Sequence, residues 1–193
     1  MHAEASPGGL AGFVRGARAA DAPALARVQV ASWQATLGAV VPAEVLAELS
    51  SAEAVAQWEE RWREAITSPP TSRHKVFVAY APGAVADPVG FASAGPATDE
   101  DRWPGTDGEL YELHLRPDVA AEGHAGRLLH AVADMLSEDG FQTACAWVLA
   151  DDRDRKEFLE AAGWAPDGCQ GNLDMGVKVP VLRLHTRLQA APA

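Results

Sequence analysis

The sequence predicts an α+β fold of three layers, with a mixed central sheet of about six to seven strands flanked by helices. The first observation is the order of periodic segments, which are helical early in the chain, then extended, then strand–helix–strand. The second is that a hairpin followed by a strand–helix–strand unit needs both antiparallel and parallel neighbours, with helices on the faces of the sheet. The third is a length of 193 residues with 48% hydrophobic residues, which suits one domain with a sizeable core.

We expect a single domain over residues 13–189, with flexible tails at residues 1–12 and 190–193 that are rich in Ala, Gly and Pro. The sequence contains no apolar run near the roughly 20 residues that span a bilayer. Its N-terminus lacks the basic and apolar regions of a secretory signal. Two cysteines without metal spacing agree with a reduced, cytoplasmic compartment and with no bound metal.

The formal net charge of −11 argues against nucleic acid or an anionic membrane as the main partner, since both repel an acidic surface. The charge is compatible with a cationic substrate such as an amine. It is equally compatible with an ordinary acidic surface.

The first third of the chain predicts a strand over residues 13–19 and then three helices. Asp21 is the expected N-cap of the first helix, with Pro23 in its first turn. A short helix begins at residues 41–42, and Ser50 with Glu53 forms a capping-box pattern for the third. The apolar residues of the first and third helices recur at helical spacing: Ala26, Val30, Trp33 and Leu37, then Val55, Trp58, Trp62, Ala65 and Ile66.

The rest of the chain predicts the hairpin and the strand–helix–strand unit. The expected strands, in chain order, are residues 75–81, 89–94, 109–115, 141–149 and 181–188. An amphipathic helix lies between the third and fourth of these, with Gly140 at its C′ position. Asp151 or Asp152 caps a last helix, which Gly163 ends. We expect Cys145 in the core and Cys169 in a Gly-rich loop, where its thiol could be exposed.

The turn over residues 120–127 joins a strand to a strongly periodic helix. Backbone N–H groups at a helix N-terminus lack internal partners, and the helix dipole is positive there. Such a site suits an anion. The turn therefore predicts a phosphate-bearing cofactor.

Four segments in this order resemble the GNAT superfamily of acyl-CoA-dependent N-acetyltransferases over about residues 14–188. They are residues 24–46 (ALARVQVASWQATLGAVVPAEVL), 113–118 (LHLRPD), 123–129 (GHAGRLL) and 158–164 (FLEAAGW). The resemblance implies the acyl-CoA N-acyltransferase fold. It also implies transfer of acetyl from acetyl-CoA to a primary amine of a small molecule or peptide by direct attack, and a possible homodimer.

The resemblance also assigns cofactor-binding residues. The strand matching residues 109–115 splays from its neighbour, the pantetheine arm of CoA pairs with the main chain there, and the pyrophosphate lies on the turn. The matched residues are Leu113, His114, Leu115, Glu122, Gly123, His124, Ala125, Gly126, Arg127 and Asp152. For Arg127, a solvated position on the helix face is an equal alternative.

Glu109 and Glu112 are the candidate general bases, because a carboxylate on this strand could deprotonate an ammonium. Each could instead be an ordinary surface charge, and His114 is a weaker candidate. Trp33 and Tyr111 are expected to line the acceptor pocket or to pack in the core. By strict alternation, Tyr111 should share a strand face with Glu109 and Leu113.

The sequence departs from the family pattern at both ends of the site. Ala120, Ala121 and Glu122 stand where a basic or amide residue and a glycine are usual, and Leu159 stands where many members have a tyrosine acid. These departures keep two alternatives open beside an active enzyme. One is a catalytically weak or inactive CoA-binding or regulatory module. The other is a scaffold, for which we expect a blocked cleft between the central strands.

Overall fold

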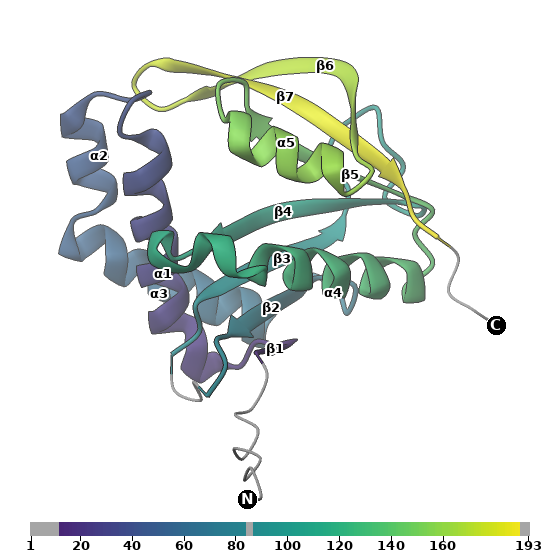
Figure 1. The fold of residues 1–193 in the computed structure, drawn as a ribbon, viewed down its shortest axis with the longest axis horizontal. Helices are drawn as coiled ribbons and strands as arrows, with labels where there is room; N and C mark the ends of the chain where they lie inside the picture. Colours follow the sequence, from purple (N-terminus) through teal and green to yellow (C-terminus); the bar gives the residue numbers. More distant parts are fainter. Residues whose placement is uncertain (1–11, 84–86, 190–193) are drawn as a thin grey trace, which may run out of the picture.

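The computed structural model describes residues 12–83 and 87–189, without the side chains of residues 120–122 (Figure 1). The predicted tails therefore lie outside the described residues, apart from Gly12. The strands are β1 (Phe13–Gly16), β2 (Lys75–Tyr80), β3 (Gly90–Pro96), β4 (Asp107–Leu115), β5 (Thr143–Leu149), β6 (Ala165–Asp174) and β7 (Lys178–Arg187). The helices are α1 (Ala22–Leu37), α2 (Ala43–Leu49), α3 (Ala52–Thr67), α4 (His124–Glu138) and α5 (Arg153–Ala161), with short 3-10 turns η1 (Ala19–Asp21) and η2 (Pro117–Glu122).

The strands form one seven-stranded sheet in the order β1-β2-β3-β4-β5-β7-β6. The β4–β5 pair is parallel, and every other neighbouring pair is antiparallel. The strand–helix–strand unit β4–α4–β5 makes the one parallel pair, because parallel neighbours need a crossover connection. The predicted mixed sheet is confirmed.

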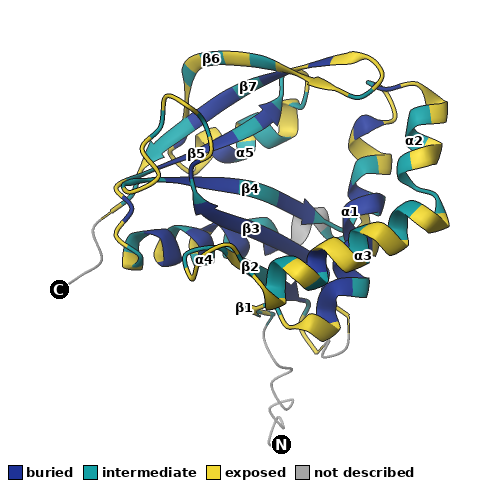
Figure 2. Cartoon of the chain, turned by 180° about the vertical axis from the view of Figure 1, so that it is seen from behind, coloured by how far each residue is buried: buried dark blue, intermediate teal, exposed yellow. Residues whose placement is uncertain are grey.

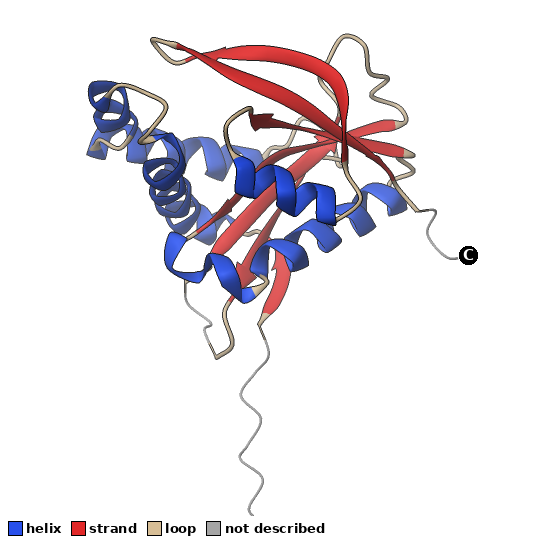
Figure 3. Cartoon of the chain, turned by 45° about the horizontal axis from the view of Figure 1, so that its top comes forward, coloured by secondary structure: helices blue, strands red, loops and turns tan. Residues whose placement is uncertain are grey.

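Helices cover both faces of the sheet and complete the three layers (Figure 3). On one face, α4 and α5 bury Leu128, Leu136 and Leu159 against the sheet. On the other, α1 and α3 bury Leu25 and Trp62 with residues of β2 and β3. Figure 2 shows the central strands largely buried, whereas the β6 edge is mostly exposed.

The expectation of a Gly-rich loop around Cys169 is wrong, because these residues belong to β6. This strand pairs only with β7 and buries none of its residues. It therefore needs no alternation of apolar and polar residues, which is the pattern that predicts a strand. Cys145 is buried in β5, as expected.

Asp21 is the N-cap residue of α1, as predicted, with Pro23 in the first turn, but its carboxylate makes no capping hydrogen bond and pairs with Arg15 at 2.8 Å instead. The predicted cap of the third helix is wrong. The N-cap of α3 is Ser51 rather than Ser50, and its hydroxyl accepts from the N–H of Ala54. At the last helix, Asp152 is the residue that caps, accepting from the N–H of Arg155 at 2.9 Å.

Candidate active site

The two central strands separate soon after they meet. β4 and β5 pair only over Asp107–Glu109 and Thr143–Cys145, at the beginning of both strands. Past this point a cleft of about 310 Å³ opens between β4, β5, the C-terminal half of α1, the first turn of α5 and the β6–β7 hairpin. The side chains that matter for its chemistry are Trp33, Tyr111, Glu112, Leu113, His114, Trp147, Asp152 and Arg155.

A β-bulge in β4 decides which side chains face the cleft. Ser93 of β3 pairs with Glu112, but Ala94 pairs with Leu110, so Tyr111 is the additional residue. Leu110 and Leu113 consequently pack in the same core beneath α4. The expectation that Tyr111 and Leu113 share a face of the strand is therefore wrong.

Glu112 and His114 form a hydrogen-bonded pair at the cleft. The His114 ring reaches Glu112 Oε2 through Nε2 at 2.6 Å and Ser32 Oγ through Nδ1 at 3.0 Å. With Glu112 ionised and the His114 ring neutral, Nε2 carries the proton and Nδ1 accepts from the Ser32 hydroxyl. The Glu112 side chain is 36% exposed and that of His114 only 9%, so Glu112 is the member that a ligand can reach. This arrangement gives a carboxylate positioned to accept a proton from the cleft.

Glu109 lies in a different environment from Glu112. Its buried carboxylate accepts the N–H of Thr98 at 2.9 Å and the Thr98 hydroxyl at 2.8 Å, and it does not line the cleft. Burial raises the pKa of Glu109, and these two hydrogen bonds oppose the rise. Its catalytic role stays a prediction, and the geometry favours Glu112.

Trp33 and Tyr111 both line the cleft while packing against protein. Trp33 meets Trp58 edge-on, with ring centroids 5.0 Å apart. The Tyr111 hydroxyl donates to the carbonyl of Pro96 at 2.5 Å, and burial raises its pKa. Both positions agree with the predicted acceptor pocket, although substrate contact itself remains a prediction.

The turn before α4 offers main-chain rather than side-chain donors. Gly123 has a left-handed φ of 74° and is the N-cap of α4. His124 is fully buried, and its Nδ1 accepts from Arg127 Nη2 at 2.7 Å, which places the ring proton on Nε2. The Glu122 side chain lies outside the described residues. Any anion at this turn would therefore meet the N–H groups of the first turn of α4.

If the turn holds CoA, as the family resemblance implies, Gly123→Ala should weaken CoA binding by about tenfold, because a left-handed alanine costs about 1–2 kcal/mol and the turn must shift to relieve it. The matched control is Gly140→Ala, at the other end of α4. Gly140 has a φ of 83°, and an added Cβ there meets nothing within 4 Å. Calorimetry with desulfo-CoA should show a weaker Kd for the first variant alone. An unchanged Kd for Gly123→Ala would exclude the turn as the CoA site.

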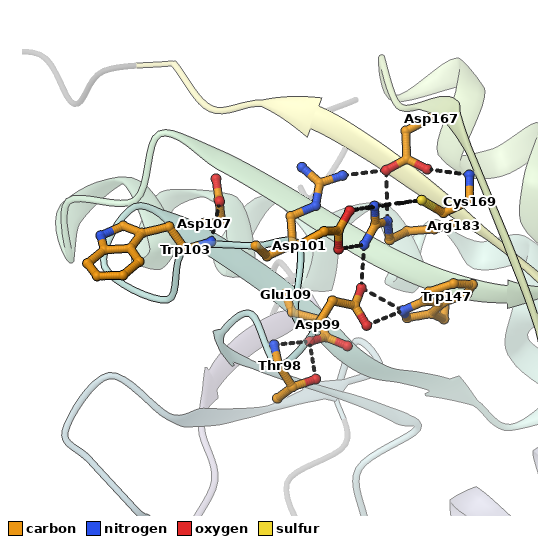
Figure 4. Close-up of polar contacts among 11 residues, drawn as sticks. Thr98, Asp99, Asp101, Trp103, Asp107, Glu109, Trp147, Asp167, Cys169 and Arg183 are labelled. Carbon is orange, nitrogen blue, oxygen red and sulfur yellow. Dashed lines mark hydrogen bonds and ion pairs between the residues drawn. The ribbon is translucent and has the colours of Figure 1, made fainter.

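Sequence reasoning missed a cluster around Arg183, which joins the loop over residues 97–106, between β3 and β4, to the β6–β7 hairpin (Figure 4). The buried Arg183 guanidinium contacts Asp99 and Asp101 at 2.6 Å and Asp167 at 2.7 Å. Asp99 also accepts from the indole N–H of Trp147 at 3.0 Å. The cluster therefore anchors one wall of the cleft. One sequence feature could have predicted this cluster: Arg183 interrupts the apolar run of residues 181–184, VLRL.

The two cysteines and Leu159 limit the chemistry. Burial raises the pKa of Cys145 to about 12, so it remains a thiol and is no nucleophile. Cys169 accepts from Arg183 Nη2 at 2.9 Å. Leu159 is fully buried in the core, so its position in α5 supplies no proton donor to the cleft. Arg155, one turn earlier on α5, is a charged cleft residue that sequence reasoning missed.

Across residues 12–83 and 87–189, no group of three or more His, Cys, Asp or Glu side chains is placed to hold a metal ion. None of the helices in these ranges has the length and hydropathy to cross a membrane.

Comparison with known proteins identifies the family of this chain. The acetyltransferase (GNAT) family profile matches residues 43–164. An uncharacterized N-acetyltransferase of Bacillus subtilis, YuaI, is 30% identical over 136 residues, which is 70% of each chain. The chain belongs to the GNAT acetyltransferase family.

Solved structures share the fold at lower identity. The PaiA N-acetyltransferase of Thermoplasma acidophilum, solved with coenzyme A, has a TM-score of 0.63 at 16% identity, with 92% of this chain and 99% of that one covered. YncA of Salmonella typhimurium, solved with acetyl-CoA, has a TM-score of 0.61 at 16% identity, with 95% and 97% covered. These likenesses support the three-layer architecture.

Proposed function

We propose that this protein transfers an acetyl group from acetyl-CoA to a primary amine of a small molecule or peptide, with Glu112 as the general base. The observation that carries the proposal is the Glu112–His114 pair, whose carboxylate faces the cleft where β4 and β5 separate. The family membership and the relatives solved with CoA or acetyl-CoA support the donor.

In the proposed reaction, Glu112 takes one proton from the substrate ammonium and so frees its lone pair. The amine nitrogen then attacks the thioester carbonyl carbon. The new C–N bond forms as the C–S bond breaks, and the second amine proton leaves with the CoA thiol. Because Cys145 is buried and protonated, direct attack without an acyl-enzyme fits the residues at hand.

Main-chain groups of this protein suit acetyl-CoA, the acetyl donor, at two places. The main chain of Leu113 and Leu115, next to the strand separation, is available for the pantetheine arm as the family resemblance implies. The first turn of α4 offers N–H donors for the pyrophosphate. The N-cap of α5 at Asp152 lines the same cleft.

One observation favours a second candidate, a CoA-binding module with weak or no turnover. Leu159 is buried in the core and cannot protonate the departing thiolate. A CoA thiol, however, has a low enough pKa to leave unaided. The open cleft argues against the third alternative, a scaffold with a blocked site.

Two measurements test the proposal. Calorimetry with acetyl-CoA and desulfo-CoA should show saturable binding, and an assay of released CoA thiol over a panel of amines should show turnover. Absence of binding at millimolar ligand would exclude both the enzyme and the CoA-binding module. Binding without turnover on any amine would select the module.

A further inference from the structure

The first turn of α5 brings an arginine into the candidate active site. Arg155 is half-buried and lines the cleft together with Glu112 and Asp152. Leu159 follows one turn later and packs into the core, so this side of α5 presents Asp152 and Arg155 to the cleft. An arginine at this depth needs an explanation, because burying a guanidinium without a partner is costly.

Arg155 has no such partner among the described residues. Its guanidinium makes no hydrogen bond or ion pair with any of them, although its backbone N–H donates to Asp152. That carboxylate is therefore occupied by the helix cap. Burial lowers the pKa of Arg155, while the charges of Asp152 and Glu112 oppose the change. The guanidinium is thus available to an anionic group of a ligand in the cleft.

Besides Asp152, whose carboxylate caps α5, the cleft thus holds two charges of opposite sign. Glu112 supplies the anion, and its charge acts on Arg155, which supplies the cation. An α-amino acid carries the complementary pair, an ammonium and a carboxylate on neighbouring atoms. Its ammonium suits Glu112, where the proposed reaction removes a proton, and its carboxylate suits the planar fork of Arg155.

The remaining walls of the cleft are largely apolar. Trp33, Trp147 and Met175 line it, and Leu173 of β6 stands at its rim with 46% of its surface exposed. Exposed apolar surface beside a polar centre is a common feature of ligand sites. It indicates that the side chain of the acceptor is apolar.

We infer that the acceptor is a free α-amino acid with an apolar side chain, whose carboxylate binds Arg155 while its amine faces Glu112. This inference rests on the proposed function and names its substrate class. Anionic oxygens could also come from the phosphates of CoA, and a guanidinium in the cleft could instead stabilise the departing thiolate. The experiment separates these three roles.

The test compares L-leucine, L-methionine and L-phenylalanine with their amides, in which the carboxylate charge is removed and the side chain retained. Wild-type protein should show kcat/KM at least about tenfold higher for the acids, the loss expected for one charged hydrogen-bonding partner. Arg155→Met should raise KM for the acids by about 10- to 100-fold and leave the amides unchanged. Arg155→Lys should restore part of the preference, since it keeps the charge without the planar fork.

The matched control is Arg153→Met, which makes the same charge change on the same helix. Arg153 is 83% exposed and pairs with Glu157 on the surface, so this variant should behave as wild type towards every substrate. Equal losses for acids and amides in Arg155→Met would overturn the inference and indicate a role with the thiolate or in folding. A weaker Kd for desulfo-CoA in that variant would indicate phosphate binding instead. Equal wild-type rates for acids and amides would also overturn it.

A binding measurement keeps this inference separate from turnover. Calorimetry titrates L-leucine and L-leucinamide into protein saturated with desulfo-CoA, where no reaction occurs. Tighter binding of the acid, lost in Arg155→Met, would support the carboxylate site even if no acetyl transfer were seen. Equal binding of the two would overturn the site while leaving acetyl transfer to other amines intact.

Discussion

Glu112→Gln is expected to lower kcat by about 10²- to 10⁴-fold, the usual contribution of a general base. The amide keeps the size of the side chain but cannot accept the ammonium proton. Steady-state kinetics with acetyl-CoA saturating measures the loss.

The informative control is Glu109→Gln, on the same strand but outside the cleft lining. Its carboxylate is engaged by Thr98, so turnover should stay within a few-fold of wild type. If Glu109→Gln abolished turnover while Glu112→Gln did not, the base would be Glu109. In that case the proposed role of Glu112 would be wrong.

Arg183→Met is expected to lower the free energy of unfolding by about 3 kcal/mol, within the range for removing one partner of a buried ion pair. The arginine side chain is 3% exposed, and its loss leaves Asp99 partly buried without a cation, whereas Asp167 keeps its ion pair with Arg102. Urea denaturation measures the change. Arg187→Met is the matched control, since Arg187 lies exposed on the same strand, and it should change stability by less than about 0.5 kcal/mol.

The stabilisation by the Arg183 cluster should decrease as the pH falls. Arg183 lowers the pKa of Asp101 to about 2, and its hydrogen bond helps to lower that of Asp167 despite the opposing effect of burial. The stabilisation by these carboxylates is complete above their unfolded pKa, near 4, and is lost as the pH falls towards 2. Wild-type stability should therefore drop over this window, and the drop should be smaller in Arg183→Met. Equal acid dependence in both proteins would contradict this account.

Local sequence patterns were enough to predict most helices and strands of the fold. The apolar stripe of α4 and the extended apolar segments around Phe77, Phe91 and Cys145 predict their elements because each element must bury one side. The order of these elements predicts a mixed sheet. The sequence pattern did not predict β6, because this exposed edge strand is held by pairing with β7 rather than by burial.

For the candidate site, too, the sequence predicts one part and the tertiary structure decides the other. Residue types near the centre, such as Glu109, Glu112 and His114, stand out in the sequence, but their orientation depends on the bulge between β3 and β4. That bulge reverses the alternation after Leu110. Only the register between β3 and β4 could show that Glu112 reaches the cleft whereas Glu109 is enclosed.

The sequence by itself determined the elements, their order and the family resemblance, because all three depend on local periodicity and short motifs. The tertiary structure decided the rest. It placed Arg155 in the cleft, buried Leu159, and gathered three aspartates around Arg183, of which Asp99 and Asp101 are 84 and 82 residues away in the chain and Asp167 is 16 residues away. Contacts of this kind depend on strand register and on the burial of charge, and neither is encoded in the pattern of any single segment.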